Sequence, residues 1–289
     1  MSDDPNWPRA SAWLRGEFAR GAVPSLAVIG MPMNKSLTPG RCDLAPDAVR
    51  EALNRYSTFD VELGIDLRAL SVVDRGDVGE LTPDSVAGST PTVLLGGDNS
   101  VTLPGVRAMG FPLERCGLLT FDAHHDLRDL ARGLTNGNPI RALLAEGLLG
   151  ENIVQIGIQA FTNSAAYAAV AREEGITVVT AEAVYASGID VAVSRALATL
   201  SAKTDALYVD LDVDVLDRAF APACPGSRPG GLQSWMLRRA ARICGAHPSV
   251  RMMDIVEVDP SQDLADVTCL GAASFLLAFA SGVASRNSR

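Results

Sequence analysis

Two short segments of the chain bring acidic and histidine side chains together directly after apolar stretches. The first is DAHHD at 122–126, and the second is LYVDLDVDV at 207–215. Alternate side chains of a strand share a face, so we expect Asp210, Asp212 and Asp214 to lie together. Like charges on a buried strand repel one another and are costly to desolvate unless a cation neutralises them. The spacing therefore predicts bound divalent metal ions.

The types of donor indicate which metal and which chemistry. Four carboxylates (Asp122, Asp126, Asp212, Asp214) and one imidazole (His124) supply four negative charges, which match two divalent cations. An oxygen-rich set with a single imidazole suits manganese better than zinc or copper. Two such ions can share one hydroxide, which is a nucleophile at neutral pH. The alternatives are a solvated polar loop at 122–126 and a helix cap with a solvated acid at 212–214.

Two further segments place polar residues at predicted strand ends. GGDNS at 96–100 predicts a glycine turn before a helix, which Asp98 or Ser100 could cap. Glu257 stands among Val and Ile in DIVEVDP, where it would pair with a cationic substrate group or with a backbone amide. The proline- and glycine-rich loop at 218–231 is expected to border a substrate pocket.

The elements that must position these residues alternate between strand and helix. Strands are predicted at 25–30, 67–74, 91–95, 117–122, 153–158, 176–179, 207–215 and 250–258, and helices at 46–56, 138–147, 164–174, 189–200, 234–244 and 264–280. This order predicts an α/β fold, a three-layer α/β/α sandwich around a mainly parallel sheet. Ligands bind such sheets at the carboxyl ends of the strands, where the candidate residues fall. We expect one domain over 1–289, with residues 1–24 as a leader that includes a short helix at 13–20.

Composition narrows the classes of partner. The chain has 289 residues, of which 47% are hydrophobic, and its net charge of -9 argues against nucleic-acid and anionic-membrane partners. Five scattered cysteines without a CxxC pair favour a reducing cytoplasm. The polar, acidic N-terminus is no signal peptide. The apolar run at 271–283 is too short to span a bilayer, so we expect a buried terminal helix and a cytoplasmic protein.

Taken together, these motifs resemble the ureohydrolase superfamily of arginases, agmatinases, guanidinobutyrases and formimidoylglutamases. The family pattern has GGDH, DAHxD and DxDxxDP segments followed by an AP…GG loop. Here they stand as GGDN at 96–99, DAHHD at 122–126, DVDVLDR at 212–218, AP at 221–222 and GG at 230–231. The late family glutamate matches Glu257. The resemblance extends from about residue 25 to 280.

The resemblance implies an arginase-like fold, two Mn²⁺ ions per chain and hydrolysis of a C–N bond in a small amidino or guanidino substrate. Carried over by position, one ion would be held by Asp122, His124, Asp212 and Asp214, and the other by Asp122, Asp126, Asp212 and Asn99. A bridging hydroxide would attack the trigonal carbon, Asp126 would hold that hydroxide and take its proton, and Glu257 would stabilise the cationic substrate. The family also implies a homo-oligomer, either a trimer or a hexamer.

Three positions depart from the family pattern. Asn99 replaces a metal-binding histidine, and its oxygen is a weaker ligand than imidazole, so that metal site could be loose, empty or adapted. Arg218 stands where the family usually has proline. Asn136 stands where arginases have a proton-shuttling histidine, which argues against arginase and makes Asn136 a candidate catalytic and substrate-binding residue.

The branch of the family is indicated by Leu127-Arg128 and by IGIQAFTNS at 156–164, which look more like formimidoylglutamases than arginases or agmatinases. Arg128 and Arg228 lie beside the predicted pocket and could bind an acidic substrate tail, or each could pair with a loop acid. Formimidoylglutamate is therefore the expected substrate. An agmatinase or guanidinobutyrase-type enzyme remains open, as does a catalytically impaired homologue with a binding or assembly role.

Overall fold

The computed structural model of the chain describes residues 4, 6–18, 23–38, 40–86 and 88–286. Eight strands form one sheet in which every neighbouring pair is parallel. Their order is β4 (Val72–Asp77), β1 (Leu26–Met31), β5 (Thr92–Gly96), β10 (Val250–Ile255), β9 (Ala206–Leu211), β6 (Cys116–Phe121), β7 (Ile153–Ile158) and β8 (Thr177–Thr180). A small antiparallel pair, β2 (Phe59–Asp60) and β3 (Ile65–Asp66), lies outside this sheet.

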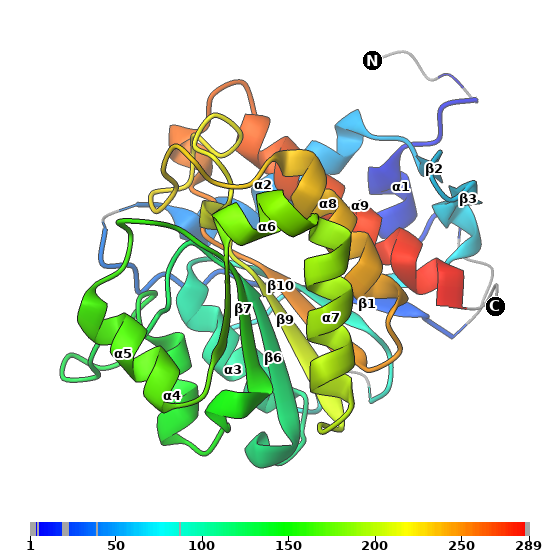
Figure 1. The fold of residues 1–289 in the computed structure, drawn as a ribbon. Helices are drawn as coiled ribbons and strands as arrows, with labels where there is room; N and C mark the ends of the chain where they lie inside the picture. Colours follow the sequence, from blue (N-terminus) through cyan, green and yellow to red (C-terminus); the bar gives the residue numbers. More distant parts are fainter. Residues whose placement is uncertain (1–3, 5, 19–22, 39, 87, 287–289) are drawn as a thin grey trace.

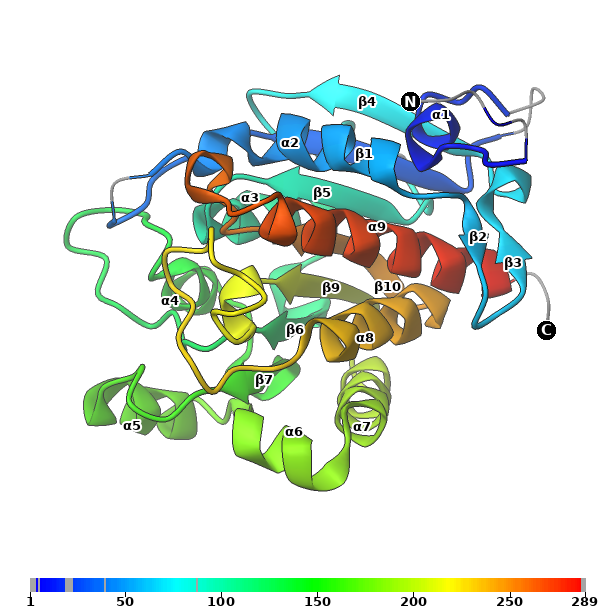
Figure 2. The same cartoon turned by 90° about the horizontal axis from the view of Figure 1, so that it is seen from above.

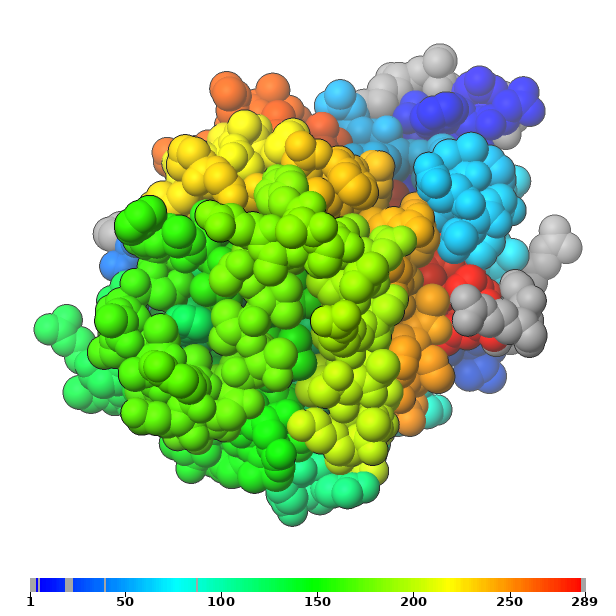
Figure 3. All heavy atoms as spheres, in the orientation of Figure 1, coloured from blue at the N-terminus to red at the C-terminus, as the bar shows by residue number. Residues whose placement is uncertain are grey.

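Helices cover both faces of the sheet, which confirms the predicted three-layer α/β/α sandwich (Figures 1 and 2). One layer holds α1 (Ala10–Leu14), α2 (Ala45–Ala52), α6 (Ala181–Ser187), α7 (Ile189–Ser201), α8 (Ser234–Ala246) and α9 (Val267–Ser285). The other holds α3 (Thr102–Ala108), α4 (Pro139–Ala145) and α5 (Ala165–Glu173). In the space-filling view, the green segment that contains α5, α6 and α7 covers most of the visible face (Figure 3).

Strand alternation explains why the sheet has two separate hydrophobic cores. In β9, Leu207, Val209 and Leu211 belong to the core under α8 and α9, whereas Ala206 and Tyr208 belong to the core under α3. Because each face of every central strand is covered, the strand sequences are almost continuously apolar. This property made the strands readable from the sequence.

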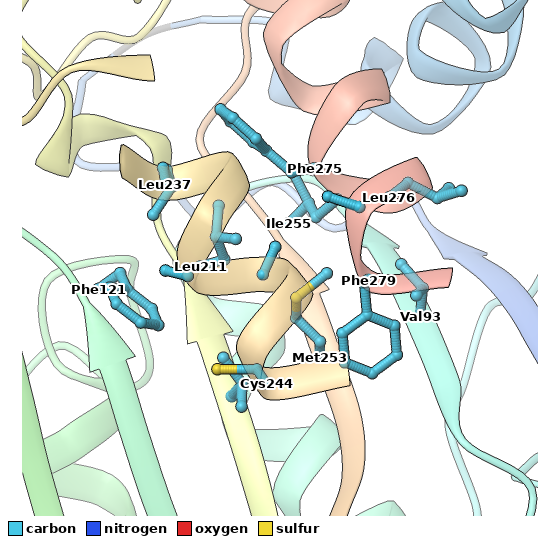
Figure 4. Packing of buried hydrophobic residues seen from close by; sticks show 14 of the residues in the cluster. Val93, Phe121, Leu211, Leu237, Cys244, Met253, Ile255, Phe275, Leu276 and Phe279 are labelled. Atoms are coloured by element: carbon cyan, nitrogen blue, oxygen red, sulfur yellow. The ribbon is translucent and has the colours of Figure 1, made fainter. Parts of the chain in front are cut away.

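Helix α9 packs against α2 and α8 and supplies much of the larger core. Figure 4 shows Phe275, Leu276 and Phe279 of α9 over Val93 and Met253 of the sheet. At 19 residues, α9 is longer than expected, and its length and composition would suffice to cross a membrane. However, 72% of its most apolar window is buried inside the protein, as expected of a core helix that is apolar on all sides.

Helix α1 of the N-terminal segment packs into the larger core. The described helix there is α1, which ends at Leu14, whereas a helix was predicted over 13–20; residues 19 and 20 lie outside the described part of the chain. Trp13 is buried, and its indole Nε1 donates to the backbone oxygen of Leu70 at 3.0 Å. The helix expected after the 96–100 turn is α3, preceded by a 3₁₀ turn in which the Asp98 side chain accepts from Ser100 N–H at 3.0 Å; helix α6 was not predicted.

The prediction that Asp210, Asp212 and Asp214 share one strand face is wrong. Strand β9 ends at Leu211, and the Asp212 side chain accepts from the Asp214 backbone N–H at 2.7 Å, which starts a 3₁₀ turn. This local hydrogen bond competes with the sheet and ends the strand early. Asp210 therefore stays inside the sheet, while Asp212 and Asp214 lie in the turn beyond it. Strand β10 likewise ends at Ile255 rather than at Val258.

Candidate metal centre

The candidate site lies where four adjacent strands end. β5, β10, β9 and β6 are neighbours in the sheet, and each is followed by one of the polar segments found in the sequence. Because these strands are parallel, the segments meet at one edge, as predicted. Above them is a cavity of about 150 Å³, lined by His124, Asp126, Arg128, Asn136, Asp212, Asp214, Arg228 and Glu257, among others.

One half of the site is built around His124. Its Nδ1 lies 2.6 Å from Asp214 Oδ2 and 3.5 Å from Asp122 Oδ1, and ligand atoms of these three residues all lie within 4.8 Å of one another. Backbone groups hold the carboxylates in place: Ala123 N–H donates to Asp214 at 2.9 Å, and His124 N–H donates to Asp122 at 2.6 Å. The three side chains could share one cation.

The other half is built around Asn99. Its Nδ2 donates to Asp126 Oδ2 at 2.7 Å and lies 3.5 Å from Asp122 Oδ2. Asp122 is therefore common to both halves. Asp212 lines the same cavity and is only 3% exposed. The contacts around His124 and those around Asn99 share Asp122, whereas the place of Asp212 in the implied ligand sets and the ligand roles themselves stay predictions.

The electrostatics of the site show that the donors fit divalent cations. Burial, and next the charge of Asp214, raises the pKa of Asp122 to about 7, and burial raises the pKa of Asp126 and of Asp212 well above the usual range. Burial opposes protonation of His124, but Asp214 and Asp122 outweigh it and raise the His124 pKa to about 12. Among the described residues, no Lys or Arg forms an ion pair with these acids. Within the described part of the chain, a protonated His124 is thus the one positive charge paired with these acids, and bound cations would neutralise the rest.

Glu257 and Asn136 form a connected pair at the wall of the cavity. Glu257 Oε1 accepts from Asn99 N–H at 2.8 Å and from Asn136 Nδ2 at 3.0 Å, so the predicted pairing with a backbone amide is present. Within the described residues, Oε2 receives no hydrogen bond and remains free for a ligand. Burial raises the pKa of Glu257 to about 8. Asn136 Oδ1 also accepts from Leu37 N–H, which ties the 34–38 loop to this wall.

The two arginines predicted at the pocket differ in how they are engaged. Arg228 Nη1 donates to the carbonyl oxygens of Pro225, Gly226 and Ser227 at 2.9–3.2 Å, so this nitrogen holds its own loop. Arg128 is exposed, and its guanidinium forms no hydrogen bond or ion pair with any described residue. Its stem lies over Gly137, where an added Cβ would come within 2.6 Å of Arg128 Cδ. Arg128 is therefore an unpaired cation at the mouth of an acidic cavity.

Arg218, which departs from the family pattern, also holds the loop. Its guanidinium donates to the carbonyl oxygens of Pro222, Cys224 and Ser227 at 3.1–3.4 Å. In this chain the rigidity that a proline would give by fixing φ comes instead from side-chain hydrogen bonds.

The sequence did not indicate the residues that hold the 122–126 segment in place through hydrogen bonds. The ring of His125 turns away from the centre and pairs with Gln155 of β7 at 2.7 Å. Asn163 accepts from His125 N–H at 2.8 Å and donates to the Ala123 oxygen at 2.9 Å. The only signal was the cluster of amide side chains after β7, which gives no partner by itself.

Comparison with known proteins places this geometry in context. The sequence pattern of the arginase family matches residues 24–281. A formimidoylglutamase of Halalkalibacterium halodurans is 37% identical to the chain over 279 residues, which cover 90% of this chain and 88% of that protein.

Solved structures agree with this likeness. The crystal structure of formimidoylglutamase from Bacillus subtilis superposes with a TM-score of 0.90 at 30% identity, covering 98% of this chain and 94% of the other. The structure of Trypanosoma cruzi formiminoglutamase with Mn²⁺ has the same fold, with a TM-score of 0.85 at 24% identity over 97% of this chain and 99% of the other.

Proposed function

The chain belongs to the arginase family of hydrolases acting on linear amidines, and from this premise we propose that it hydrolyses formimidoylglutamate with two bound Mn²⁺ ions. The observation that carries the proposal is Arg128, whose guanidinium pairs with no described residue and lies at the mouth of a cavity with an acidic floor. An acidic floor suits a cationic amidine, and the arginine suits a carboxylate at the other end of the substrate. Formimidoylglutamate and guanidinobutyrate carry both groups whereas agmatine lacks the carboxylate, and the likeness to the formimidoylglutamase of Halalkalibacterium halodurans favours the first of them.

The donor arrangement supports two ions. His124 and Asp214 would hold one, Asn99 and Asp126 the other, and Asp122 and Asp212 would serve both. When bound, the ions supply a hydroxide at neutral pH and neutralise the carboxylates. The Trypanosoma cruzi formiminoglutamase binds Mn²⁺ in its own structure, and this likeness supports the choice of the same metal here.

The chain's own residues would orient the substrate and move protons. Glu257 Oε2 is free to accept an amidinium N–H, while Asn136 and the Asn99 backbone hold Oε1 in place. Asp126 lines the cavity, and its carboxylate would take a proton from the attacking water and pass it to the departing nitrogen. Water adds across the C–N bond, so that glutamate and formamide are the two products.

Product analysis tests the proposal. Protein loaded with Mn²⁺ would be assayed on formimidoylglutamate, agmatine and guanidinobutyrate, with formamide and urea measured separately. We expect formamide from formimidoylglutamate and little urea from the guanidino compounds. Urea release as the faster reaction would favour an agmatinase or guanidinobutyrase activity instead. Two bound ions without turnover of any substrate would favour an impaired homologue.

A further inference from the structure

A buried polar cluster beneath the metal centre is not used by the mechanism above. Asp254 of β10 and Tyr208 of β9 lie on the sheet face covered by α3, and Thr102 begins α3 above them. Tyr208 OH donates to Asp254 Oδ2 at 2.7 Å, and Leu211 N–H donates to Asp254 Oδ1 at 2.9 Å. Tyr208, Asp254 and Thr102 are fully buried.

Thr102 links this cluster to Asn99. Its Oγ1 lies 2.7 Å from Asn99 Oδ1 and 3.0 Å from Asp254 Oδ2. The two residues are three positions apart on one helical face, which brings their side chains together. A hydroxyl has one proton, so Thr102 can donate to only one of these two oxygens.

The orientation of the Asn99 amide decides whether it can bind a cation. As it stands, Nδ2 faces Asp126 and Oδ1 faces Thr102. An amide nitrogen is no metal ligand, so Asn99 serves the centre only after a half-turn that exchanges Oδ1 and Nδ2. The shape of the side chain is the same in both orientations, so its hydrogen-bond partners must choose between them.

We propose that Thr102 is the positioning residue that presents Asn99 Oδ1 to the metal centre, by accepting the amide N–H on its hydroxyl oxygen while donating its proton to Asp254. This inference rests on the dimetal function proposed above. In the turned orientation Thr102 makes two hydrogen bonds, one of them to a carboxylate. In the present orientation it satisfies only one of its two acceptors. On the Thr102 side the hydrogen bonds favour the turned orientation, and a cation bound between Asn99 Oδ1 and Asp126 would replace the Asn99–Asp126 hydrogen bond that the turn gives up.

Asp254 is suited to receive that proton. Burial raises its pKa to about 6, while Leu211, Tyr208, Thr102 and the neighbouring Asp210 lower it, and its two oxygens already accept from Tyr208 O–H and Leu211 N–H as an ionised carboxylate does. An ionised carboxylate is a stronger acceptor than the amide oxygen of Asn99. Residues that orient a metal ligand in this way typically change metal affinity by about 10–100-fold.

The test is a Mn²⁺ titration at pH 8, followed by metal analysis and by the electron paramagnetic resonance signal of paired ions. We expect two ions in the wild type. In Thr102→Val, one ion should bind as before and the other about 10–100-fold more weakly, with loss of the paired-ion signal. Thr102→Ser keeps the hydroxyl and should restore both. Thr102→Ala removes the same group with a smaller side chain and gives the same reading if the valine variant does not fold.

Two matched controls distinguish a positioning role of Thr102 from a general loss of stability. Tyr208→Phe also removes one buried hydrogen bond to Asp254 but does not touch Asn99, so it should keep both ions. In an Asn99→Ala background, Thr102→Val should cause no further loss. An equal loss in that background, or two tightly bound ions in Thr102→Val alone, would overturn the inference. A wild type that binds no Mn²⁺ would instead defeat the proposed function, and this inference with it.

Discussion

Without metal, the carboxylates of the centre should make the fold less stable as the pH rises. Burial raises the pKa of Asp122 from 3.8 to about 7 and that of Glu257 from 4.5 to about 8. At a pH between the unfolded and the folded pKa of each group, the folded chain keeps a proton that the unfolded chain has lost. The free energy of unfolding therefore falls as the pH increases, opposite to the effect of a carboxylate held in an ion pair.

The size of the effect follows from the same shifts. Each group contributes about 1.4 kcal/mol per pH unit, so these two alone should lower the free energy of unfolding by about 5 kcal/mol between roughly pH 5 and pH 7, and Asp126 and Asp212, whose pKa values burial also raises, act in the same direction. The unfolding entropy of a chain of this length is about 0.6 kcal/mol/K. The melting temperature should therefore fall by about 8 °C over this interval.

The assay is thermal unfolding of chelator-treated protein over this pH range, with Asp122→Asn as the matched variant. The amide keeps the shape of the side chain but does not titrate, so the share of the pH dependence that Asp122 contributes should disappear. Saturating Mn²⁺ should reverse the trend, because ligands bind metal in their deprotonated form. A chelated wild type whose melting temperature rises with pH, or an Asp122→Asn variant with the wild-type slope, would refute the reasoning.

Three further changes probe single side chains. Asp214→Ala removes the anchor of His124 and should abolish turnover and weaken metal binding by about 100-fold; unchanged metal content on elemental analysis would show that Asp214 is no ligand. Asn99→His offers imidazole and should tighten the weaker metal site by about 10-fold, which equilibrium dialysis would detect, and an unchanged affinity would mean that residue 99 lies outside the centre. Arg128→Ala should raise KM for formimidoylglutamate by about 5-fold, the equivalent of about 1 kcal/mol for an exposed pair. The KM for agmatine should stay the same, and parallel changes for both substrates would remove the proposed role of Arg128.

Much of the sheet could be predicted because its strands are buried on both faces and are therefore apolar throughout. The ends of the strands could not be read in the same way. β9 stops at Leu211 because Asp212 caps a 3₁₀ turn, and the alternating sequence gives no sign of this local hydrogen bond. The missed helix α6 is short, and its side-chain cap Thr180 is a weak signal by itself.

The sequence also indicated some residues of the candidate site and not others. The acids and His124 were visible because charged residues after apolar runs are conspicuous. Their supports were not, because Thr102, Asn163 and Arg218 act through contacts with segments distant in sequence or with backbone oxygens. His124 and His125 are adjacent in the sequence, and only the fold shows that the ring of His125 contacts Gln155 instead of facing the metal centre.

Two residues of the site adopt a backbone conformation that no sequence pattern announced. Asp126 has φ of 53° and Glu257 has φ of 65°, in the left-handed region where a residue with a side chain costs about 1–3 kcal/mol. Glycine would remove that cost but also the carboxylate. Both residues are also among the acids whose pKa is raised by burial. Conformational strain and charge repulsion thus fall on the same residues, and a centre that binds cations accounts for both, whereas a solvated polar loop accounts for neither.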